Sequence, residues 1–217
     1  MLALCLADTH SNVSALRRLD ALLRREAGRF SVVLAAGDIT IAGHEAYAAD
    51  FVKVVRRHGV PLLLVHGNND TAEAVETFRR EGVTIHRRER TLHGVRFVGF
   101  GGDGTQPHDF DVAGGESLEL RLADSILLTH LPPPGVRYTV PNNADVAIAA
   151  ASQPRRPAAS HALFDAPRTQ VCGHIHHHEG IAWLGPTKVI KLRAAMWNRC
   201  AMLDLKSLRV VFSDLGV

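Results

Sequence analysis

The stretch LALCLADTH, residues 2–10, decides the fold of this chain. Its first six residues are apolar without interruption, which is typical of a short strand buried on both faces. The apolar run stops at Asp8, and His10 follows two positions later. The segment therefore predicts a buried strand over residues 2–7 with ligand-type side chains directly after its carboxyl end.

Helices and strands alternate beyond this first strand. Ser11 or Asn12 is the expected N-cap of a helix with apolar residues at helical spacing, and Gly28 is its expected end. This alternation predicts a parallel sheet, in which ligands bind outside the carboxyl ends of the strands. Further strands are expected at residues 31–36 and 61–66, and further helices at residues 45–58 and 71–81, the last one capped by Thr71.

The second half of the chain is rich in strands. A βαβ half followed by a strand-rich half predicts an α/β fold with two packed sheets and helices outside. We expect residues 1–217 to form a single domain. Strands are expected at residues 83–86, 95–100, 125–129, 169–172, 181–184, 187–192, 199–203 and 208–213, a helix at residues 158–164, and long loops at residues 101–115 and 131–157.

The composition is that of a globular protein, with 46% hydrophobic and 22% charged residues in a chain of 217. The net charge of +3 is spread over scattered arginine pairs, which does not favour a nucleic-acid-binding stripe. Three cysteines are too few for a disulfide framework. The N-terminus lacks the basic region of a signal peptide, and no apolar run is long enough to span a membrane. We therefore expect a cytoplasmic protein without a membrane partner.

Five short segments share one feature, because each places Asp, Asn or His directly after an apolar strand. Together they supply seven candidate metal ligands, more than one tetrahedral or octahedral ion usually takes from a protein. His174 and His176 are two positions apart and point to the same side of an extended segment. The pattern predicts two neighbouring divalent ions held by Asp8, His10, Asp38, Asn68, His130, His174 and His176.

Such a pair of ions would suit phosphate chemistry. Two divalent ions carry more positive charge than Asp8 and Asp38 return, so the site would attract a phosphate group and offset the negative charge on its oxygens. Ions about 4 Å apart can clamp an in-line displacement and deprotonate a bound water, which supplies a hydroxide nucleophile near neutral pH. Manganese, iron, zinc or nickel would each suit these ligands.

The same five segments, in this order along nearly the whole chain, resemble the calcineurin-like metallophosphoesterase superfamily. Gly37-Asp38-Ile39-Thr40 and the short length are similar to its small prokaryotic Icc-like phosphoesterases. The resemblance implies a four-layer αββα sandwich of two mixed β-sheets flanked by helices. It also implies a division of the ligands: Asp8, His10 and His176 for one metal, Asn68, His130 and His174 for the other, and Asp38 as the bridge.

Asn69 departs from the family pattern. Many members have at this position a histidine, held by the following aspartate, that protonates the leaving alkoxide. An amide cannot deliver a proton at neutral pH, but it can donate a hydrogen bond to a phosphate oxygen. We therefore expect a phosphodiester or an activated phosphate ester as the substrate, unless His44, His108, His161, His177 or His178 supplies the proton.

The residues with expected roles beyond metal binding are few. Asn12 is either only the helix cap or also a substrate-binding residue. The expected catalytic residues are Asn69, Asp70 and His130, and the expected substrate-binding residues are Asn12 and Asn69.

Three alternatives to a phosphodiesterase are a phosphomonoesterase or protein phosphatase, a nuclease, and a non-catalytic scaffold of the same fold. Seven filled ligand positions oppose the scaffold, and the scattered arginines oppose the nuclease. A small phosphoester is the expected partner, and the sequence does not indicate an oligomeric state.

Gly99-x-Gly101-x-x-Gly104 matches a dinucleotide fingerprint but lacks the helix that must follow it. Surface positions are expected for Asp103, Asp109, Asp111, Glu116 and His177, and core or interface positions for Trp183 and Trp197.

Overall fold

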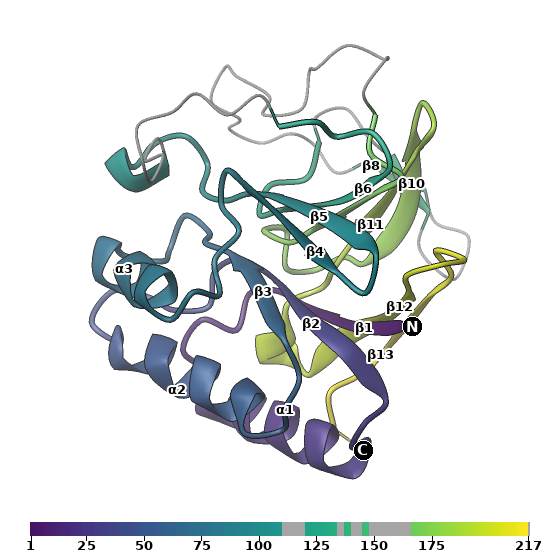
Figure 1. The fold of residues 1–217 in the computed structure, drawn as a ribbon. Helices are drawn as coiled ribbons and strands as arrows, with labels where there is room; N and C mark the ends of the chain where they lie inside the picture. Colours follow the sequence, from purple (N-terminus) through teal and green to yellow (C-terminus); the bar gives the residue numbers. More distant parts are fainter. Residues whose placement is uncertain (110–119, 134–136, 140–144, 148–165, 217) are drawn as a thin grey trace.

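The computed structural model describes residues 1–109, 120–133, 137–139, 145–147 and 166–216. Two mixed sheets dominate it, and their strands come from both halves of the chain (Figure 1). The first sheet contains β1 (Leu2–Leu6), β2 (Phe30–Ala36), β3 (Leu62–Val65), β12 (Arg199–Asp204) and β13 (Val210–Asp214). The second sheet contains β4 (Arg88–Leu92), β5 (Val95–Phe100), β6 (Ser125–Thr129), β7 (Arg137–Thr139), β8 (Asp145–Ala147), β9 (Thr169–Cys172), β10 (Gly180–Leu184) and β11 (Thr187–Lys191).

The strand order is β13-β12-β1-β2-β3 in the first sheet and β4-β5-β6-β9-β11-β10-β7-β8 in the second. Strands β1, β2 and β3 run parallel to one another, and so do β5, β6, β9 and β11. The helical elements are α1 (Val13–Arg25), α2 (Ala46–Arg56) and α3 (Ala72–Arg80), with 3-10 turns η1 (Pro107–Asp109) and η2 (Ala195–Trp197).

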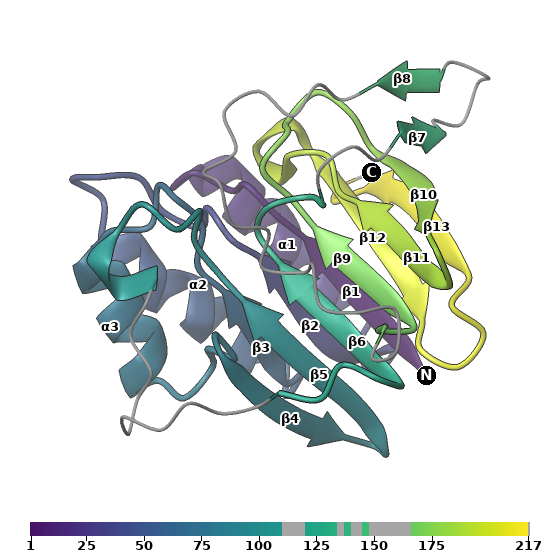
Figure 2. The same ribbon diagram turned by 90° about the horizontal axis from the view of Figure 1, so that it is seen from above.

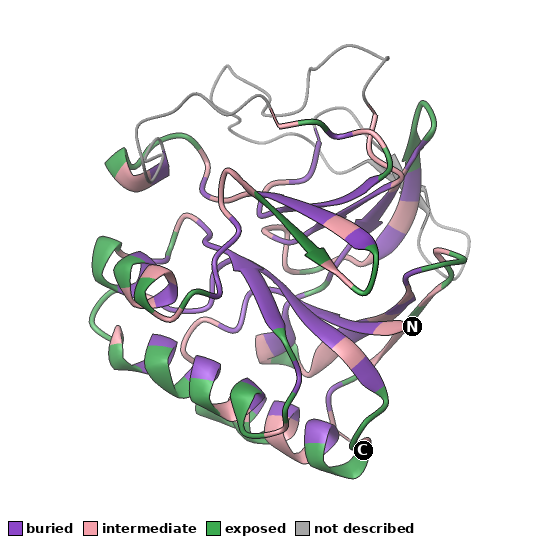
Figure 3. Cartoon of the chain, viewed as in Figure 1, coloured by how far each residue is buried: buried purple, intermediate pink, exposed green. Residues whose placement is uncertain are grey.

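Strand β1 shows how the layers are built. Leu4 and Leu6 pack in the core that includes residues of helices α1, α2 and α3, whereas Ala3 and Cys5 belong to the core between the two sheets. Successive strand residues point to opposite faces, so a strand covered on both faces needs an unbroken apolar run. The three helices lie together on the outer face of the first sheet, and their solvent-facing sides are exposed (Figures 2 and 3).

Local signals place the first helices as expected. Asn12 is the N-cap of α1, and its side-chain oxygen accepts a hydrogen bond from Ala15 N at 2.9 Å. Thr71 caps α3 in the same way, with Ala74 N as the donor at 3.4 Å. The expected α/β sandwich of two mixed sheets flanked by helices is confirmed.

The structure corrects two expectations in the second half of the chain. Residues 83–86 form only isolated bridges, and the strand lies beyond them at β4, an edge strand paired antiparallel with β5. The region expected as a loop at residues 131–157 contains the paired strands β7 and β8. Apolar patterns could not predict these strands. Strand β4 reads RERTL, which is too polar to look like a buried strand, and β7 and β8 are only three residues long.

Other expectations concern single residues and segments. The expected helix at residues 158–164 lies outside the described residues. All three cysteines are buried as free thiols, and none of them forms a disulfide. Among the helices that the structure describes, none is long and apolar enough to cross a membrane.

Candidate metal centre

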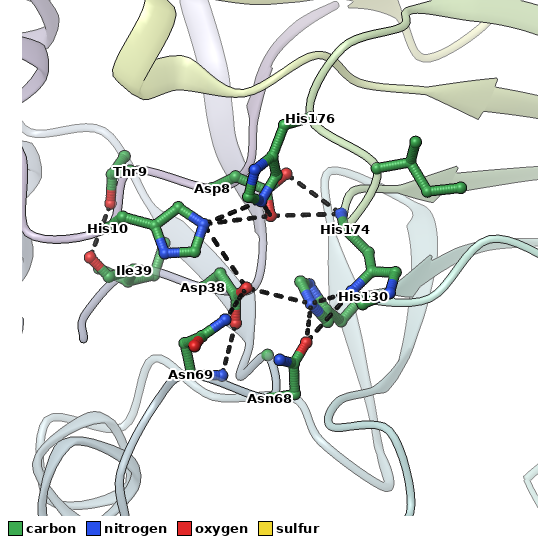
Figure 4. Close-up of polar contacts among 12 residues, drawn as sticks. Asp8, Thr9, His10, Asp38, Ile39, Asn68, Asn69, His130, His174 and His176 are labelled. Carbon is green, nitrogen blue, oxygen red and sulfur yellow. Dashed lines mark hydrogen bonds and ion pairs between the residues drawn. The ribbon is translucent and has the colours of Figure 1, made fainter. Parts of the chain in front are cut away.

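The seven predicted ligands converge at one place. They follow the carboxyl ends of five strands, β1, β2 and β3 of the first sheet and β6 and β9 of the second. Parallel strands end at a common edge, and the two sheets bring their edges together. Figure 4 shows the side chains of Asp8, His10, Asp38, Asn68, His130, His174 and His176 pointing toward one another across this gap.

Several of these residues adopt backbone conformations that are unusual for side chains with a Cβ. The φ angles of Asp8, His10, Asp38 and His174 are 57°, 46°, 53° and 73°. Such left-handed residues cost about 1–3 kcal/mol each and persist only where the surroundings impose them. Backbone hydrogen bonds impose them here: Asp8 N donates to Gly37 O at 2.9 Å, and His10 N donates to Asp38 O at 3.0 Å. The turns that present the ligands are therefore fixed by the fold.

The first group of ligand atoms belongs to Asp8, His10, Asp38 and His176, and all four lie within 4.8 Å of one another. The Nε2 atoms of His10 and His176 are 3.0 Å apart. His176 Nε2 lies 3.6 Å from Asp8 Oδ1, and His10 Nε2 lies 3.6 Å from Asp38 Oδ2. The His176 side chain is 28% exposed, so the group opens to solvent on its side.

The second group consists of Asn68, His130 and His174. Asn68 Oδ1 lies 2.9 Å from His130 Nε2 and 3.1 Å from His174 Nδ1, and these two nitrogens are 3.3 Å apart. His130 Nδ1 donates a hydrogen bond to Ala36 O at 2.9 Å. This contact fixes the tautomer that leaves Nε2 free as a ligand atom.

Asp38 connects the two groups. Its Oδ2 atom lies 3.6 Å from His10 Nε2 in the first group and 3.5 Å from His130 Nε2 in the second. Its Oδ1 atom approaches the backbone of Gly67 so closely that a Cβ there would lie 2.1 Å away. Gly67 is therefore required for Asp38 to hold this position between the two groups.

The electrostatics of the centre match the arrangement. Burial opposes the charge of Asp38, but His130 and the hydrogen bonds from Asn69 hold the pKa of this carboxyl well below its usual range. Burial also opposes protonation of His130, but the charges of Asp38 and Asp8 raise its pKa to about 9. Burial lowers the pKa of His10 and His174, which favours neutral imidazoles.

The donor set fits divalent cations. Two buried carboxylates, four imidazoles and one amide oxygen face one another, and no lysine or arginine of the described residues pairs with Asp8 or Asp38. In the metal-free centre, protonated His130 is the cationic partner of Asp38, and a divalent cation that displaces this proton would compensate both buried carboxylates. Imidazole, carboxylate and amide oxygen are the ligand types that divalent transition metals accept.

The comparison with family models decides the identity. Residues 1–178 match the model described as calcineurin-like phosphoesterase, a span that includes all seven ligand positions. The chain belongs to the calcineurin-like phosphoesterase family. The resemblance found in the five sequence segments is thereby confirmed, and no curated protein matches the chain in sequence.

Solved structures show that the fold of this phosphoesterase is shared at low sequence identity. The protein TT1561 of Thermus thermophilus has a TM-score of 0.65 at 14% identity, with 99% of this chain and 98% of that chain covered. An archaeal phosphodiesterase has a TM-score of 0.54 at 12% identity, with 99% of both chains covered. A dimetal phosphatase from Danio rerio has a TM-score of 0.51 at 11% identity, covering 100% and 99%. The likeness extends over whole chains and concerns the fold.

The remaining predicted site residues of the phosphoesterase lie around the centre. Asn69 donates from its backbone N to Asp38 Oδ1 at 2.8 Å and from its side chain to Asp38 Oδ2 at 2.7 Å. Asp70 is buried, and its carboxylate accepts hydrogen bonds from Gly67 N and Thr40 N at 2.8 and 2.7 Å, from Thr40 Oγ1 and from Ile39 N. Asp70 thus ties the loop after β3 to the loop after β2.

Lys191 is a site residue that the sequence analysis missed. Its side chain is buried, and Nζ donates to Ile175 O at 2.6 Å, to His178 O at 3.4 Å and to Leu192 O. The ammonium therefore holds the loop that carries His174 and His176, while burial lowers the pKa of the lysine. The sequence contained a signal for this role, since Lys191 follows the apolar pair Val189-Ile190 in an expected strand. A lysine buried at such a position almost always has a polar partner.

The expected surface position of Asp109 was wrong, and Trp183 and Trp197 do not fill the core, which leaves their interface position a prediction. Asp109, expected at the surface, is buried with its carboxylate next to His66. Trp183 and Trp197, expected in the core or an interface, are 66% and 38% exposed. The Trp197 ring lies 5.8 Å from the ring of His176, at the margin of the centre. His177 is exposed, as expected.

Proposed function

We propose that two divalent cations bind the centre, one in each ligand group with Asp38 between them, and that the protein hydrolyses a phosphodiester or an activated phosphate ester. The observation that carries the proposal is the position of Asp38 Oδ2, which faces ligand atoms of both groups at 3.5 and 3.6 Å. Bound there, the cations would activate a water molecule and stabilise negative charge on the phosphoryl oxygens.

The preference for a diester comes from Asn69. Its amide cannot protonate a leaving alkoxide, and both of its hydrogen-bonding N–H groups are directed at Asp38. We assign it two roles: it fixes the bridging carboxylate, and its second amide hydrogen donates to a phosphate oxygen. We assign Asp70 a positioning role and His130 a ligand role, because the ring nitrogens of His130 are committed to Ala36 O and to the ligand group.

Trp197 supports a substrate with more than one organic group. Its partly exposed ring lies 4.7 Å from the His177 ring, and the Arg193 guanidinium lies 5.8 Å from its centroid. The turn η2 is anchored to the centre, because Ala195 N donates to Ala7 O at 2.8 Å and Met196 N donates to Asp8 O at 3.1 Å. We propose that this aromatic margin contacts the second ester group of a diester. Asn12 is used as the α1 cap, and a contact of its amide with substrate remains part of this proposal.

One experiment tests the function directly. Metal-free protein is reconstituted in turn with Mn²⁺, Fe²⁺, Zn²⁺ and Ni²⁺ and assayed on bis-p-nitrophenyl phosphate, p-nitrophenyl phosphate and a cyclic nucleotide. The expected result is metal-dependent hydrolysis with the bis-ester or the cyclic nucleotide preferred, and activity lower by about 100-fold or more for Asp38→Asn. Much faster turnover of the monoester would refute the diester preference, and the absence of hydrolysis with every metal would favour a binding scaffold.

A further inference from the structure

A second group of ligand-type side chains lies outside the metal centre. His66 directly follows β3, and His108 and Asp109 belong to η1. One ligand atom from each of these three residues lies within 4.8 Å of the other two. We propose that His66, His108 and Asp109, hereafter the η1 cluster, bind one further divalent transition-metal ion, separate from the metal centre.

The distances within the η1 cluster suit coordination. Asp109 Oδ1 lies 2.9 Å from His66 Nε2 and 3.9 Å from His108 Nε2. The second distance is too long for a hydrogen bond, but two atoms that each lie about 2.0–2.2 Å from one ion can be about 4 Å apart. The metal centre shows comparable spacings, such as 4.0 Å between Asp8 Oδ1 and His10 Nε2.

Unpaired nitrogens supply an independent observation. His108 Nε2 and His66 Nδ1 are buried and have no hydrogen-bond partner among the described residues. A buried polar atom without a partner destabilises the fold, and coordination of His108 Nε2 removes one such atom. When His66 coordinates through Nε2, its proton moves to Nδ1, and the hydrogen bond from Nε2 to Asp109 Oδ1 is replaced by coordination of both atoms to the ion.

The surroundings hold the carboxylate in place. Asp109 Oδ2 accepts hydrogen bonds from Gly104 N at 2.9 Å and Gln106 N at 3.1 Å, which leaves Oδ1 directed at the two histidines. The backbone of Gly102 approaches so closely that a Cβ there would lie 1.9 Å from Asp109 Oδ1. Such backbone support is what orients the ligands of metal sites.

His86 is the neighbour that does not belong to the ligand set. Its Nδ1 accepts from Gly101 N at 2.8 Å, and its Nε2 donates to the backbone carbonyl of Asp109 at 3.1 Å. Both nitrogens are therefore engaged, and burial lowers the pKa of His86 to about 3, which keeps it neutral. His86 positions η1, and coordination is left to His66, His108 and Asp109.

The burial of the η1 cluster, rather than its ligand types, points to a structural ion. Two imidazoles and one carboxylate are a ligand set typical of Zn²⁺. The side chains of His66 and Asp109 are only 1% and 2% exposed, so a substrate could not reach the ion readily. The ion would join η1 to the end of β3, where His66 lies two residues before the ligand Asn68. It would thus stiffen one edge of the metal centre.

Metal content tests the inference. The Asp38→Asn/His176→Ala variant removes the bridge and one histidine of the metal centre, and addition of His108→Ala removes a ligand of the η1 cluster. After dialysis against Zn²⁺, the first variant is expected to retain one equivalent of zinc more than the second, so that any zinc on the remaining Asn68, His130 and His174 cancels in the difference. His44→Ala replaces an exposed histidine and is the matched control, expected to retain the equivalent. Co²⁺ loaded into the first variant should show visible absorption of four-coordinate cobalt that His108→Ala reduces by the share of one ion.

Either of two results would overturn the inference: no zinc in the Asp38→Asn/His176→Ala variant, or an equal zinc content with and without His108. Circular dichroism confirms that each variant is folded. If the double variant does not fold, His108→Ala alone is compared with the unaltered protein, where a loss of one equivalent is expected and an unchanged content overturns the inference. The result does not depend on hydrolysis, so it is independent of the proposed function.

Discussion

The side-chain amide of Asn69 donates a hydrogen bond at 2.7 Å to Asp38 Oδ2, the oxygen that faces both ligand groups. The residue at the position of the usual proton donor is thus part of the support for the bridging carboxylate. Under the proposed function, this relationship explains how the centre would hold its cations without an acid for alcohol leaving groups.

Asn69→His should restore that acid. We expect kcat/KM for phenyl phosphate, which has a poor leaving group, to rise by about 100-fold, at the lower end of what a positioned acid contributes. The rate with p-nitrophenyl phosphate should change much less, because its leaving group needs no proton. Asn69→Ala is the control and should show no such selective gain. An equal response of both esters to Asn69→His would contradict the assignment.

Asp38→Asn should remove the connection between the ligand groups. Bound metal ions stabilise the charge of the transition state by several kcal/mol. We therefore expect kcat to fall by about 100-fold or more, together with loss of bound metal. Metal analysis and initial rates measure the two effects. Asp50→Asn alters an exposed carboxylate on α2 and should leave both unchanged. Full activity of Asp38→Asn would exclude a bridging role.

Lys191→Met should weaken metal binding without touching a ligand. The variant loses the ammonium that holds Ile175 O and His178 O, so His174 and His176 lose their support. We expect metal affinity to fall by about 10-fold or more, as for other residues that orient ligands. Lys188→Met is a matched control, because Lys188 lies on the same strand and donates to Leu208 O instead. Equal affinities for both variants in competition titrations would refute the positioning role.

Trp197→Leu should affect substrate binding more than turnover. An aromatic contact contributes about 0.5–1.5 kcal/mol, so we expect KM for the bis-ester to rise by about 2- to 10-fold with little change in kcat. Steady-state kinetics measure both constants. Trp183→Leu, which alters the more exposed tryptophan on β10, should leave KM unchanged. A fall in kcat alone would show that Trp197 supports the centre rather than the substrate.

Asp20 makes stability depend on acid pH. Its carboxylate accepts from Arg57 Nε at 2.8 Å and from His58 Nε2 at 2.7 Å, which joins α1 to the end of α2. The bond from Arg57 holds the pKa of Asp20 below the ordinary value of 3.8. The stabilisation is therefore present above pH 3.8 and is lost as the pH falls through the lower pKa of the folded state.

Asp20→Asn measures this contribution. We expect the variant to melt about 1–3 °C lower at neutral pH, as for exposed ion pairs in a chain of this size. The difference should shrink toward zero in melting curves recorded at progressively more acid pH. A difference that stays constant down to the most acid pH would show that the charge of Asp20 is not its source.

The parts of the fold and site that sequence patterns predict are those with local causes. The buried strand at β1 follows from an unbroken apolar run, and the α1 N-cap at Asn12 from its side chain. Strand β4 could not be predicted from such patterns, because it consists mainly of polar residues. It forms through its antiparallel pairing with β5, at the edge of the sheet. The burial of Asp109 depends on the distant His66, and no local pattern contains that contact.

The left-handed turns at Asp8, His10, Asp38 and His174 have a consequence for anyone who would copy this centre. Short peptides with these residues would relax into ordinary conformations and turn the donor atoms away from one another. Preorganisation resides in the sheet edges, which hold the turns before any cation arrives. Transplanting the seven side chains to another scaffold would therefore transfer the ligand residues without the arrangement of their donor atoms.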